Sequence, residues 1–474
     1  MNTIKKFSYR IMNIQTGYIF VLLLVVRIPY LIAYYPGLMI YDTGSSIAQF
    51  YGLETHVVAI SNMPDAILSN HHMILLTFLM GGFVKLGELL GSQNIGYFLY
   101  VLIQVLISNC IIAYSLHVIK CRINPIMYSV ILIIYAFLPV ISLWQITMSK
   151  DALFSTFIML FSVLLFRAVC TKGELLNNTK FIFLFFFTAL MCILTKQQGS
   201  YIIVICAIVL LVAYKRKALF TSILMLGVGV FYLTLFTNII LPSLHVAPSS
   251  KQEMMGFMFQ QTAKYVVDYG EDVTQEEKRK INAVLPYSDL KELYNPYMQD
   301  PVKFEYNQNS SDIDRKEYIQ TWFKMFFKHP DSYFSATLLN CSGFFLPGYE
   351  NEYSYWPVYL EYSDILNDSE CFELKNIKPP LIYSFLTVSI EHLGKVPIIS
   401  LLFRSFFYVW IIIIGFFISL IRKRTDVIVY GLPILISIIL LVISPDIEFR
   451  YVLPFVYFAP VFYAFIFLQR GEKI

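Results

Sequence analysis

Residues 17–42 read GYIFVLLLVVRIPYLIAYYPGLMIYD, an apolar run that ends in a Pro-Gly turn and an aspartate. A helix needs about 20 apolar residues to cross the hydrocarbon layer of a membrane, and this run supplies them. Lys5, Lys6 and Arg10 precede it, as in a signal peptide, but no small-residue cleavage site follows. The stretch therefore predicts a retained first span that delivers Asp42 to the membrane surface.

The rest of the chain has the composition of a membrane protein. Of its 474 residues, 57% are hydrophobic and 14% are charged, and the mean hydropathy is +0.62. A soluble protein of this length would expose too much apolar surface to stay in solution. The fold class that we predict is all-α, a polytopic integral membrane protein with about 10 transmembrane helices, at residues 17–35, 95–119, 127–146, 151–169, 181–196, 199–214, 218–241, 397–420, 427–444 and 450–469.

A further apolar helix is predicted at residues 73–90, where glycines and two charges interrupt the run. We expect this helix to lie in the membrane interface or to dip part-way in. With that placement and a cytoplasmic N-terminus, Lys and Arg concentrate in the inside connections, as the positive-inside rule requires. These residues are Lys120, Arg122, Arg167, Lys172, Lys180, Lys215, Arg216, Lys217, Arg422, Lys423, Arg424, Arg470 and Lys473.

This topology places both termini in the cytoplasm and divides the chain into three parts. They are an N-terminal transmembrane module at 1–241 with an outer loop at 36–94, an extracytoplasmic region at 242–396, and C-terminal transmembrane helices at 397–474. The extracytoplasmic region holds 22 of the 32 acidic residues, and we expect helices within 250–330 and ordered loop in the rest. Cys341 and Cys371 lie in this region, where a disulfide and two unpaired thiols are both compatible with the sequence.

Five polar turns are predicted to share the outer face. In the first, Asp42 can act as general base on an acceptor hydroxyl or bind a divalent cation beside a lipid phosphate; alternatively, it caps the helix that follows. In the second, His71 and His72 open the helix at 73–90. They can donate hydrogen bonds to phosphate or sugar oxygens, or simply anchor that helix at the interface.

The third turn sets Lys150 beside Asp151 at the bilayer edge, which is costly unless the charges are used or paired. We expect Lys150 to hold a phosphate and Asp151 to orient it or a metal. The alternative is a snorkelling lysine and an aspartate favoured by a helix N-terminus. Lys196 and Gln197 form the fourth turn, a short hairpin between two spans, for which an ordinary polar turn is the alternative.

The fifth turn precedes the last span and carries Glu448 and Arg450. Both can bind a sugar or its phosphate, and arginine suits bidentate contact with phosphate; an ordinary polar turn is again the alternative. Arg27 and Arg404 fall inside predicted spans, where a buried arginine usually faces the bundle interior or a polar cavity. Snorkelling to the interface is the other possibility for these two arginines.

This organisation resembles the glycosyltransferase C superfamily, membrane enzymes that use polyprenyl-phosphate sugars. The resemblance rests on Asp42 in the first outer loop, the interface helices after it, the Lys150-Asp151 pair and the Glu-x-Arg-Tyr turn at 448–451. The chain is also similar over most of its length to an uncharacterised family of Gram-positive polytopic proteins. The shared stretches are Pro36-Gly37 with Tyr41-Asp42, Asn70-His71-His72, Ser149-Lys150-Asp151, Gln260-Gln261-Thr262-Ala263, Tyr294-Asn295-Pro296 and Lys328-His329-Pro330 with Tyr333.

The likeness to the superfamily implies that Asp42 is the catalytic residue, as base or metal ligand. Thr43 follows Asp42 where many members carry a second acidic residue, so the likeness does not extend to a complete metal site. No cofactor is implied with certainty, and the option left open is a divalent cation, Mn or Mg, held by Asp42 and Asp151.

The turns and the resemblance together predict an integral-membrane glycosyltransferase. It would move a sugar from a polyprenyl-phosphate donor to an acceptor hydroxyl on the outer face of the cell membrane, with Lys150, Arg450 and Arg27 holding the phosphate. Its partners would be the lipid-linked donor, membrane lipids and a cell-envelope glycan, lipid or protein acceptor, and no nucleic acid. The alternative is a flippase or exporter of lipid-linked saccharide or polymer, suggested by Arg27 and Arg404 within spans.

Overall fold

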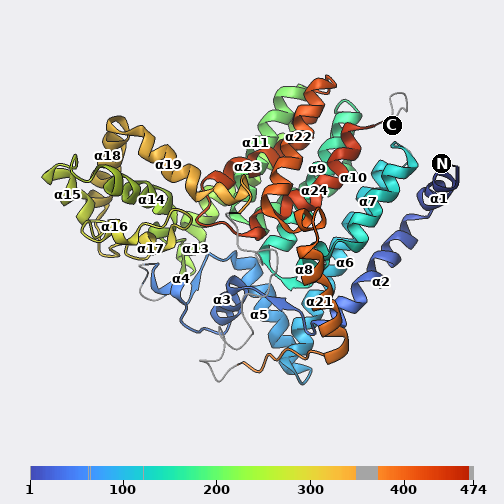
Figure 1. Ribbon diagram of the computed structural model, residues 1–474, viewed down its shortest axis with the longest axis horizontal. Helices are drawn as coiled ribbons and strands as arrows, with labels where there is room; N and C mark the ends of the chain where they lie inside the picture. Colours follow the sequence, from blue (N-terminus) through green and yellow to red (C-terminus); the bar gives the residue numbers. More distant parts are fainter. Residues whose placement is uncertain (1, 62, 64–65, 121, 349–371, 469–474) are drawn as a thin grey trace.

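The structure is a computed structural model that describes residues 2–61, 63, 66–120, 122–348 and 372–468. It is mostly helical, at 75%. Figure 1 shows two parts, a bundle of long helices and a smaller group of helices beside it, formed by α14 to α19. We call this smaller group the lateral unit.

The N-terminal part of the bundle alternates long helices with short connecting elements. In chain order these are α1 (Asn2–Met12), α2 (Thr16–Ala33), β1 (Leu38–Met39), α3 (Tyr41–Phe50), α4 (His56–Ala59), β2 (Leu68–Ser69), α5 (Ile74–Leu89), α6 (Gln93–Ile119), α7 (Pro125–Phe137), α8 (Pro139–Gln145), β3 (Thr147–Met148), α9 (Lys150–Cys170), η1 (Glu174–Asn177), α10 (Thr179–Thr195), α11 (Gln197–Tyr214), η2 (Lys215–Lys217), α12 (Leu219–Phe231), η3 (Tyr232–Ile240), α13 (Leu241–Ser243) and β4 (Val246–Ala247). All seven apolar runs predicted in this part contain a helix.

The lateral unit and the C-terminal helices follow. They are α14 (Lys251–Tyr269), α15 (Gln275–Asn282), α16 (Leu290–Leu293), α17 (Asp300–Lys303), α18 (Asp312–Lys328), α19 (Pro330–Asn340), η4 (Ser342–Phe344), α21 (Pro380–Lys395), η5 (Ile399–Phe403), α22 (Ser405–Ile421), α23 (Val427–Val442), η6 (Phe449–Val452) and α24 (Leu453–Ile466). Helices in 250–330 were predicted and are present.

The described helices are those of a multi-pass membrane protein. Six are long and apolar enough to cross a membrane, and the bent pair α7–α8 would make a seventh. Three shorter apolar helices, α10, α22 and α23, coincide with the remaining predicted runs. α5 is a 16-residue helix that carries Lys85 and Glu88, and its predicted place in the membrane interface stays a prediction.

The break between α7 and α8 explains why an arginine, Arg27, is buried inside the bundle. The two helices meet at 49°, where Pro139 has no N–H to return to the preceding turn. Arg27, on α2, is fully buried and donates to the carbonyl oxygens of Tyr135 at 2.5 Å and Ala136 at 2.6 Å, and to Gln145 Oε1 at 2.5 Å. Arg27 therefore faces the bundle interior, where it donates hydrogen bonds to carbonyl groups at the break between the two helices. Its predicted role as a phosphate ligand is wrong.

Two features near the C-terminus differ from the prediction. The run at 397–420 does not begin as a span: Pro397 is followed by the short helix η5, and Arg404 precedes α22 instead of lying inside it. The region predicted as ordered loop before it contains α21, a 16-residue helix that begins at Pro380. Proline is well suited to the first turn of a helix, so the two adjacent prolines signalled this start.

The helix α9 lies at the centre of the bundle. Residues 151–166 are all buried, and the helix packs against α6, α10, α23 and α24. Its first turn is capped by Ser149, whose hydroxyl accepts from the N–H of Asp151 at 3.1 Å. The charged side chains at the start of α9 are thus carried by a helix that is buried along most of its length.

The helices α5 and α6 form a hairpin, and they approach each other closely at a glycine, Gly96. A Cβ built on Gly96 would lie 1.9 Å from the carbonyl oxygen of Phe83 and 2.7 Å from the amide nitrogen of Gly87. Both are backbone atoms, which cannot move without separating the helices.

We therefore expect Gly96→Ala to destabilise the protein by about 2 kcal/mol or more, as overpacking does. The matched control is Gly82→Ala, also in this hairpin, where a Cβ has open space around it. That change should stabilise slightly, since alanine favours a helix by up to about 1 kcal/mol. Thermal unfolding in detergent measures both, and equal melting temperatures would contradict the close packing.

The lateral unit has its own apolar core, separate from that of the bundle. Phe259, Tyr265, Tyr318 and Tyr333 belong to it, and each is at most 1% exposed. Cys341 follows α19, is buried, and belongs to the core of the bundle. The thiol of Cys341 is free and donates to the carbonyl oxygen of Leu338, so the unpaired alternative is the one that the structure shows for Cys341; Cys371 lies outside the described residues.

Candidate functional site

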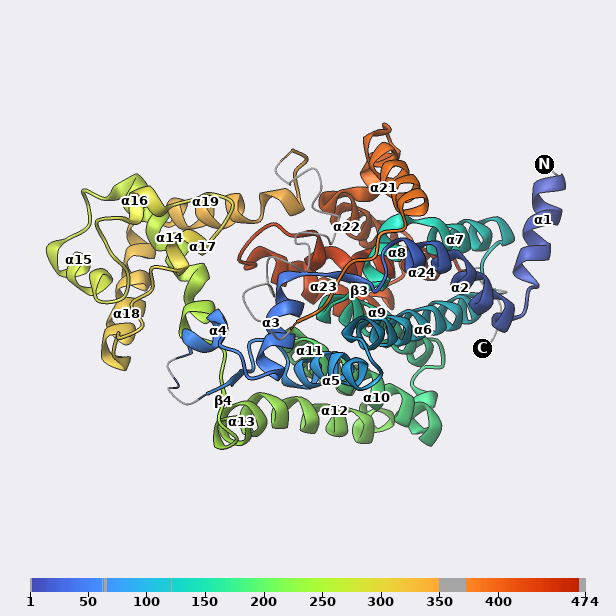
Figure 2. The same ribbon diagram turned by 90° about the horizontal axis from the view of Figure 1, so that it is seen from below.

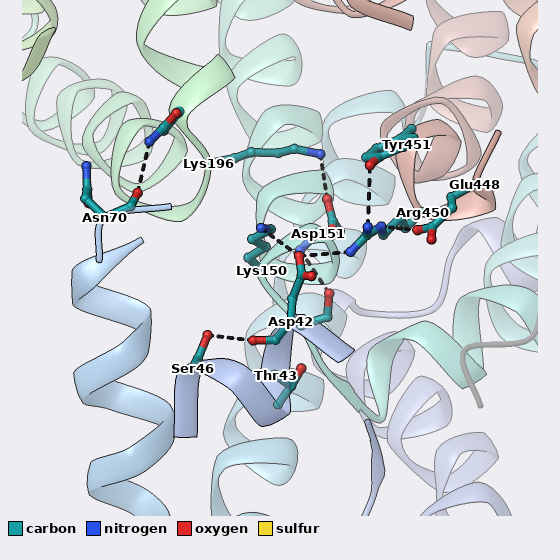
Figure 3. Close-up of polar contacts among 12 residues, drawn as sticks. Asp42, Thr43, Ser46, Asn70, Lys150, Asp151, Lys196, Glu448, Arg450 and Tyr451 are labelled. Carbon is teal, nitrogen blue, oxygen red and sulfur yellow. Dashed lines mark hydrogen bonds and ion pairs between the residues drawn. The ribbon is translucent and has the colours of Figure 1, made fainter. Parts of the chain in front are cut away.

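The predicted polar turns meet at one end of the bundle, which we call the site end. Figure 3 shows Asp42, Lys150, Asp151, Lys196 and Arg450 directed toward one another from separate parts of the chain. They come from the start of α3, the start of α9, the connection between α10 and α11, and η6. α1 and the end of α24 lie at the opposite end, the far end (Figure 1).

Two short parallel ladders bring these turns together. β1 pairs with β3, with Leu38 opposite Thr147, so the chain that leads to Asp42 runs beside the chain that leads to Lys150. The Thr43 hydroxyl also donates to the carbonyl oxygen of Met148. β2 pairs with β4 and fixes the turn that carries the histidines.

Asp42 is held between two cations. Its Oδ2 lies 2.8 Å from Lys150 Nζ and 2.9 Å from Arg450 Nη1, and the three side chains are no more than 17% exposed. Burial alone would raise the pKa of Asp42, but Arg450 and Lys150 outweigh it and hold that pKa well below its usual range. Asp42 is therefore fully ionised at neutral pH.

The alternative helix-capping role of Asp42 is not what the structure shows. The residue before α3 is Ile40, and no side chain caps this helix. Asp42 is the second residue of α3, and its carboxylate is directed at Lys150 and Arg450 (Figure 3).

Asp151 pairs with Lys196 and not with its neighbour Lys150. Lys196 Nζ lies 2.5 Å from Asp151 Oδ1, and Asp151 is only 1% exposed. Adjacent residues of a helix do not face each other, so Lys150 and Asp151 go to different partners. Asp151 Oδ2 is buried and has no hydrogen-bond partner among the described residues, which leaves an acceptor available.

Arg450 links the last turn to the cluster. It forms an ion pair with Glu448 through Nε as well as with Asp42 through Nη1. Burial raises the pKa of Glu448 to about 7 although Arg450 opposes this, and the carboxylate of Asp446 adds to the rise. Glu448 thus changes charge close to neutral pH.

The two histidines adjoin this cluster. Burial lowers the pKa of His71 to about 4 and holds that of His72 well below its usual range, so both are neutral at pH 7. A charge on His72 would help to lower the pKa of Asp42. His72 is 2% exposed, and neither of its ring nitrogens has a hydrogen-bond partner among the described residues. The described residues therefore leave the hydrogen-bonding capacity of this buried imidazole unused.

Gln197 has a structural contact. Its side-chain N–H donates to the carbonyl oxygen of Asn70 at 3.0 Å, and this joins the start of α11 to the histidine turn. The predicted contact of Gln197 with substrate would use the side-chain oxygen or the second N–H of the amide.

Sequence reasoning assigned no role to three contributors, of which it named only Tyr451, as part of the Glu-x-Arg-Tyr turn. Tyr451 places its ring 5.1 Å from Lys196 Nζ and 5.2 Å from Arg450 Cζ, in cation–π range. Gln299 and Asn340 of the lateral unit donate to the carbonyl oxygen of Ser444, at 2.9 Å and 2.6 Å. Tyr451 could have been found from its place beside Arg450, whereas the two amides lie more than a hundred positions away from Ser444 and give no local signal.

The residues present do not fit a divalent cation. Asp42 and Asp151, the predicted metal ligands, each lie against a lysine ammonium group. Among the described residues no group of three or more His, Cys, Asp or Glu side chains is placed to hold a metal ion. Hard cations prefer a set of oxygen ligands, and here positive side chains occupy that place.

The charges of the cluster suit a single anion. Lys150, Lys196 and Arg450 carry three positive charges, and Asp42 and Asp151 carry two negative ones. Among these five side chains one positive charge is in excess, and burial raises the pKa values of the two neighbouring carboxyl groups, Asp446 and Glu448. A phosphodiester carries one negative charge and would balance the cluster while both of these carboxyl groups are protonated.

Comparisons with known proteins give one match. The model of a family described as "Family of unknown function (DUF6020)" matches residues 3–473. No curated protein and no solved structure matches the chain. A likeness to a family without an assigned reaction was expected and is confirmed to that extent, while the likeness to the glycosyltransferase C superfamily stays a prediction.

Proposed function

Because this chain belongs to DUF6020, a family of unknown function, we propose its function from the geometry of the site end: it is a membrane glycosyltransferase that uses a polyprenyl-phosphate sugar. The observation that supports the proposal best is the convergence of Asp42 with Lys150 and Arg450 at 2.8 Å and 2.9 Å. A carboxylate and two cations in one buried cluster can take a proton and hold a phosphate in the same reaction.

The proposal includes the topology. All ten apolar runs would cross the membrane, with both termini in the cytoplasm and the site end on the outer face. Two connections at the far end support this, because Lys215, Arg216 and Lys217 lie in one and Arg422, Lys423 and Arg424 in the other. A cysteine at position 196 that reacts with a label added from the cytoplasmic side would contradict this topology.

In the proposed reaction the acceptor oxygen attacks the anomeric carbon of the sugar. The bond from that carbon to the phosphate oxygen breaks, and the polyprenyl phosphate leaves with the electron pair. Lys150 and Arg450 stabilise the negative charge of the leaving group, and Asp42 takes the acceptor proton. The configuration at the anomeric carbon is inverted.

Donor binding would activate Asp42. In the free protein the two cations hold its pKa well below the usual range, which makes it a weak base. A phosphate bound to Lys150 and Arg450 neutralises them, so the pKa of Asp42 rises when the donor is in place. His72 would bind a sugar hydroxyl, because neither of its ring nitrogens has a hydrogen-bond partner among the described residues.

The test uses purified protein in nanodiscs with a panel of polyprenyl-phosphate sugars. Release of polyprenyl phosphate is measured for the wild type and for Lys150→Met. The control is Lys85→Met, since Lys85 is half exposed and forms its ion pair with Glu88 on its own helix. Release by the wild type and by Lys85→Met, with at least a tenfold loss in Lys150→Met, supports the proposal. No release from any donor, with lipid binding intact, would favour the flippase or exporter.

The pH dependence of donor binding follows from Glu448. Its pKa is raised to about 7, so the residue is neutral below that pH and negative above it. Ionised Glu448 neutralises Arg450, and a phosphodiester has no ionisation of its own in this range. We expect donor affinity to fall about tenfold between pH 6 and pH 8, a loss of about 1.4 kcal/mol.

Glu448→Gln should make this profile flat, as measured by equilibrium binding of a polyprenyl-phosphate sugar. Glu174→Gln serves as the control, because Glu174 is exposed at the far end and pairs with Lys217. A profile that keeps its slope in Glu448→Gln would show that another group is responsible.

Chelation should have little effect. Since cationic side chains lie against both Asp42 and Asp151, we expect EDTA to change the transfer rate by less than about twofold. The measurement is polyprenyl phosphate release before and after EDTA treatment, and after Mn²⁺ or Mg²⁺ is added back. Loss with EDTA and recovery with either metal would show that a cation displaces these lysines.

A further inference from the structure

One face of the lateral unit is apolar and exposed. On α18, Ile319, Phe323 and Phe327 follow at four-residue spacing and are 41%, 55% and 68% exposed. Residues four apart lie on one side of a helix, so these side chains form a line along it. An exposed apolar line of this kind marks an interaction surface.

The line continues onto α19. Phe334 and Leu338 are 61% and 66% exposed and also lie four residues apart. The ring of Phe326 joins the two helices, with its centroid 5.3 Å from that of Phe327 and 6.1 Å from that of Phe334. We call Ile319, Phe323, Phe327, Phe334 and Leu338 the apolar face.

A polar line runs beside the apolar face. Lys316, Gln320 and Lys324 are exposed, again at four-residue spacing, next to the apolar residues of α18. The nearby acidic residue Glu317 is paired with Arg279 of α15 at 3.5 Å. A helix with an apolar line and lysines along its margin is typical of segments that lie in a membrane interface.

The C-terminal end of α19 is tied to the ends of two apolar bundle helices. Asn340 donates to the carbonyl oxygen of Ser444, just after α23, and Trp410 of α22 donates to that of Phe345 at 2.7 Å. Leu338 is two residues before Asn340, so the apolar face begins at the level where these helices end. Figure 1 shows α18 and α19 on one side of α14, with α16 and α17 on the other.

We propose that the apolar face docks the lateral unit onto the lipid bilayer, with its phenylalanines at the boundary of the acyl chains and Lys316 and Lys324 at anionic headgroups. This rests on the proposed topology, in which the site end lies outside. It does not depend on catalysis, and contact with lipid can be measured in a protein that transfers no sugar.

The test places the photoreactive residue benzoylphenylalanine at position 323 or 334 of the full chain, in nanodiscs of phosphatidylethanolamine and phosphatidylglycerol. Phe304 is the matched control: it is 52% exposed, close to the 55% of Phe323, but follows α17 on the other side of α14. After irradiation, mass spectrometry measures the lipid attached to each variant.

We expect at least five times more lipid adduct at positions 323 and 334 than at 304. In a protein with Lys316→Glu and Lys324→Glu, the adduct at 323 should fall in nanodiscs with phosphatidylglycerol. Equal yields at 323 and 304 would overturn the proposal. So would a cross-linked product of twice the chain mass, because that would assign the apolar face to a second copy of the protein.

Discussion

Sugar transfer is expected to fall at least about a hundredfold when Asp42 is replaced by asparagine, in line with the usual contribution of a positioned base. Asparagine keeps the shape of the side chain but cannot accept the proton of the acceptor hydroxyl. It also removes the counter-ion of Lys150, at 2.8 Å in the wild type, and leaves Arg450, at 2.9 Å, with Glu448 alone. Donor affinity should therefore stay the same or increase while the transfer rate collapses.

Measuring kcat together with the dissociation constant of the donor separates the two roles of Asp42. Asp426→Asn is the control, since Asp426 pairs with Arg424 at the far end and is 36% exposed. Full activity in Asp42→Asn, in a protein that remains folded, would eliminate Asp42 as the base. A loss of donor binding that is as large as the loss of rate would mean that the carboxylate only organises the cations.

The second large effect is expected from Lys196→Met. Methionine leaves Asp151 as a buried charge without a counter-ion, and its Oδ2 already has no hydrogen-bond partner among the described residues. Removing one partner of a buried ion pair costs about 3–5 kcal/mol. We expect an apparent melting temperature in detergent that is roughly 5–10 °C lower.

Two comparisons define this experiment. Lys217→Met breaks an exposed pair with Glu174 and should cost less than about 1 kcal/mol. Adding Asp151→Asn to Lys196→Met removes the buried charge and should restore much of the stability. A Lys196→Met protein as stable as the wild type would show that water or another cation reaches Asp151.

Hydropathy was sufficient to predict the bundle, because a membrane span is a local property of about 20 residues. Arg27 could only be explained in three dimensions. Its partners are carbonyl groups at the end of α7, more than a hundred residues away in the chain. The helix α21 was missed because many polar and aromatic residues around it suggested loop, whereas its apolar face packs against α2.

The composition of the site was predictable, but its pairing was not. Short turns between spans put Asp42, Lys150 and Arg450 at the same end of the bundle whatever the order of the helices. Which carboxylate meets which cation depends on the direction of each side chain. The sequence neighbours Lys150 and Asp151 suggested a pair, and helical geometry instead directs them to Asp42 and Lys196.

The two hydrogen bonds from the lateral unit to the turn after α23 have a mechanical consequence. Gln299 and Asn340 hold the backbone of Ser444, six residues before Arg450. Asp42 and Lys150, in contrast, are joined to each other through the β1–β3 ladder. A displacement of the lateral unit would therefore be transmitted through Ser444 to Arg450, while the β1–β3 ladder keeps the spacing of Asp42 and Lys150.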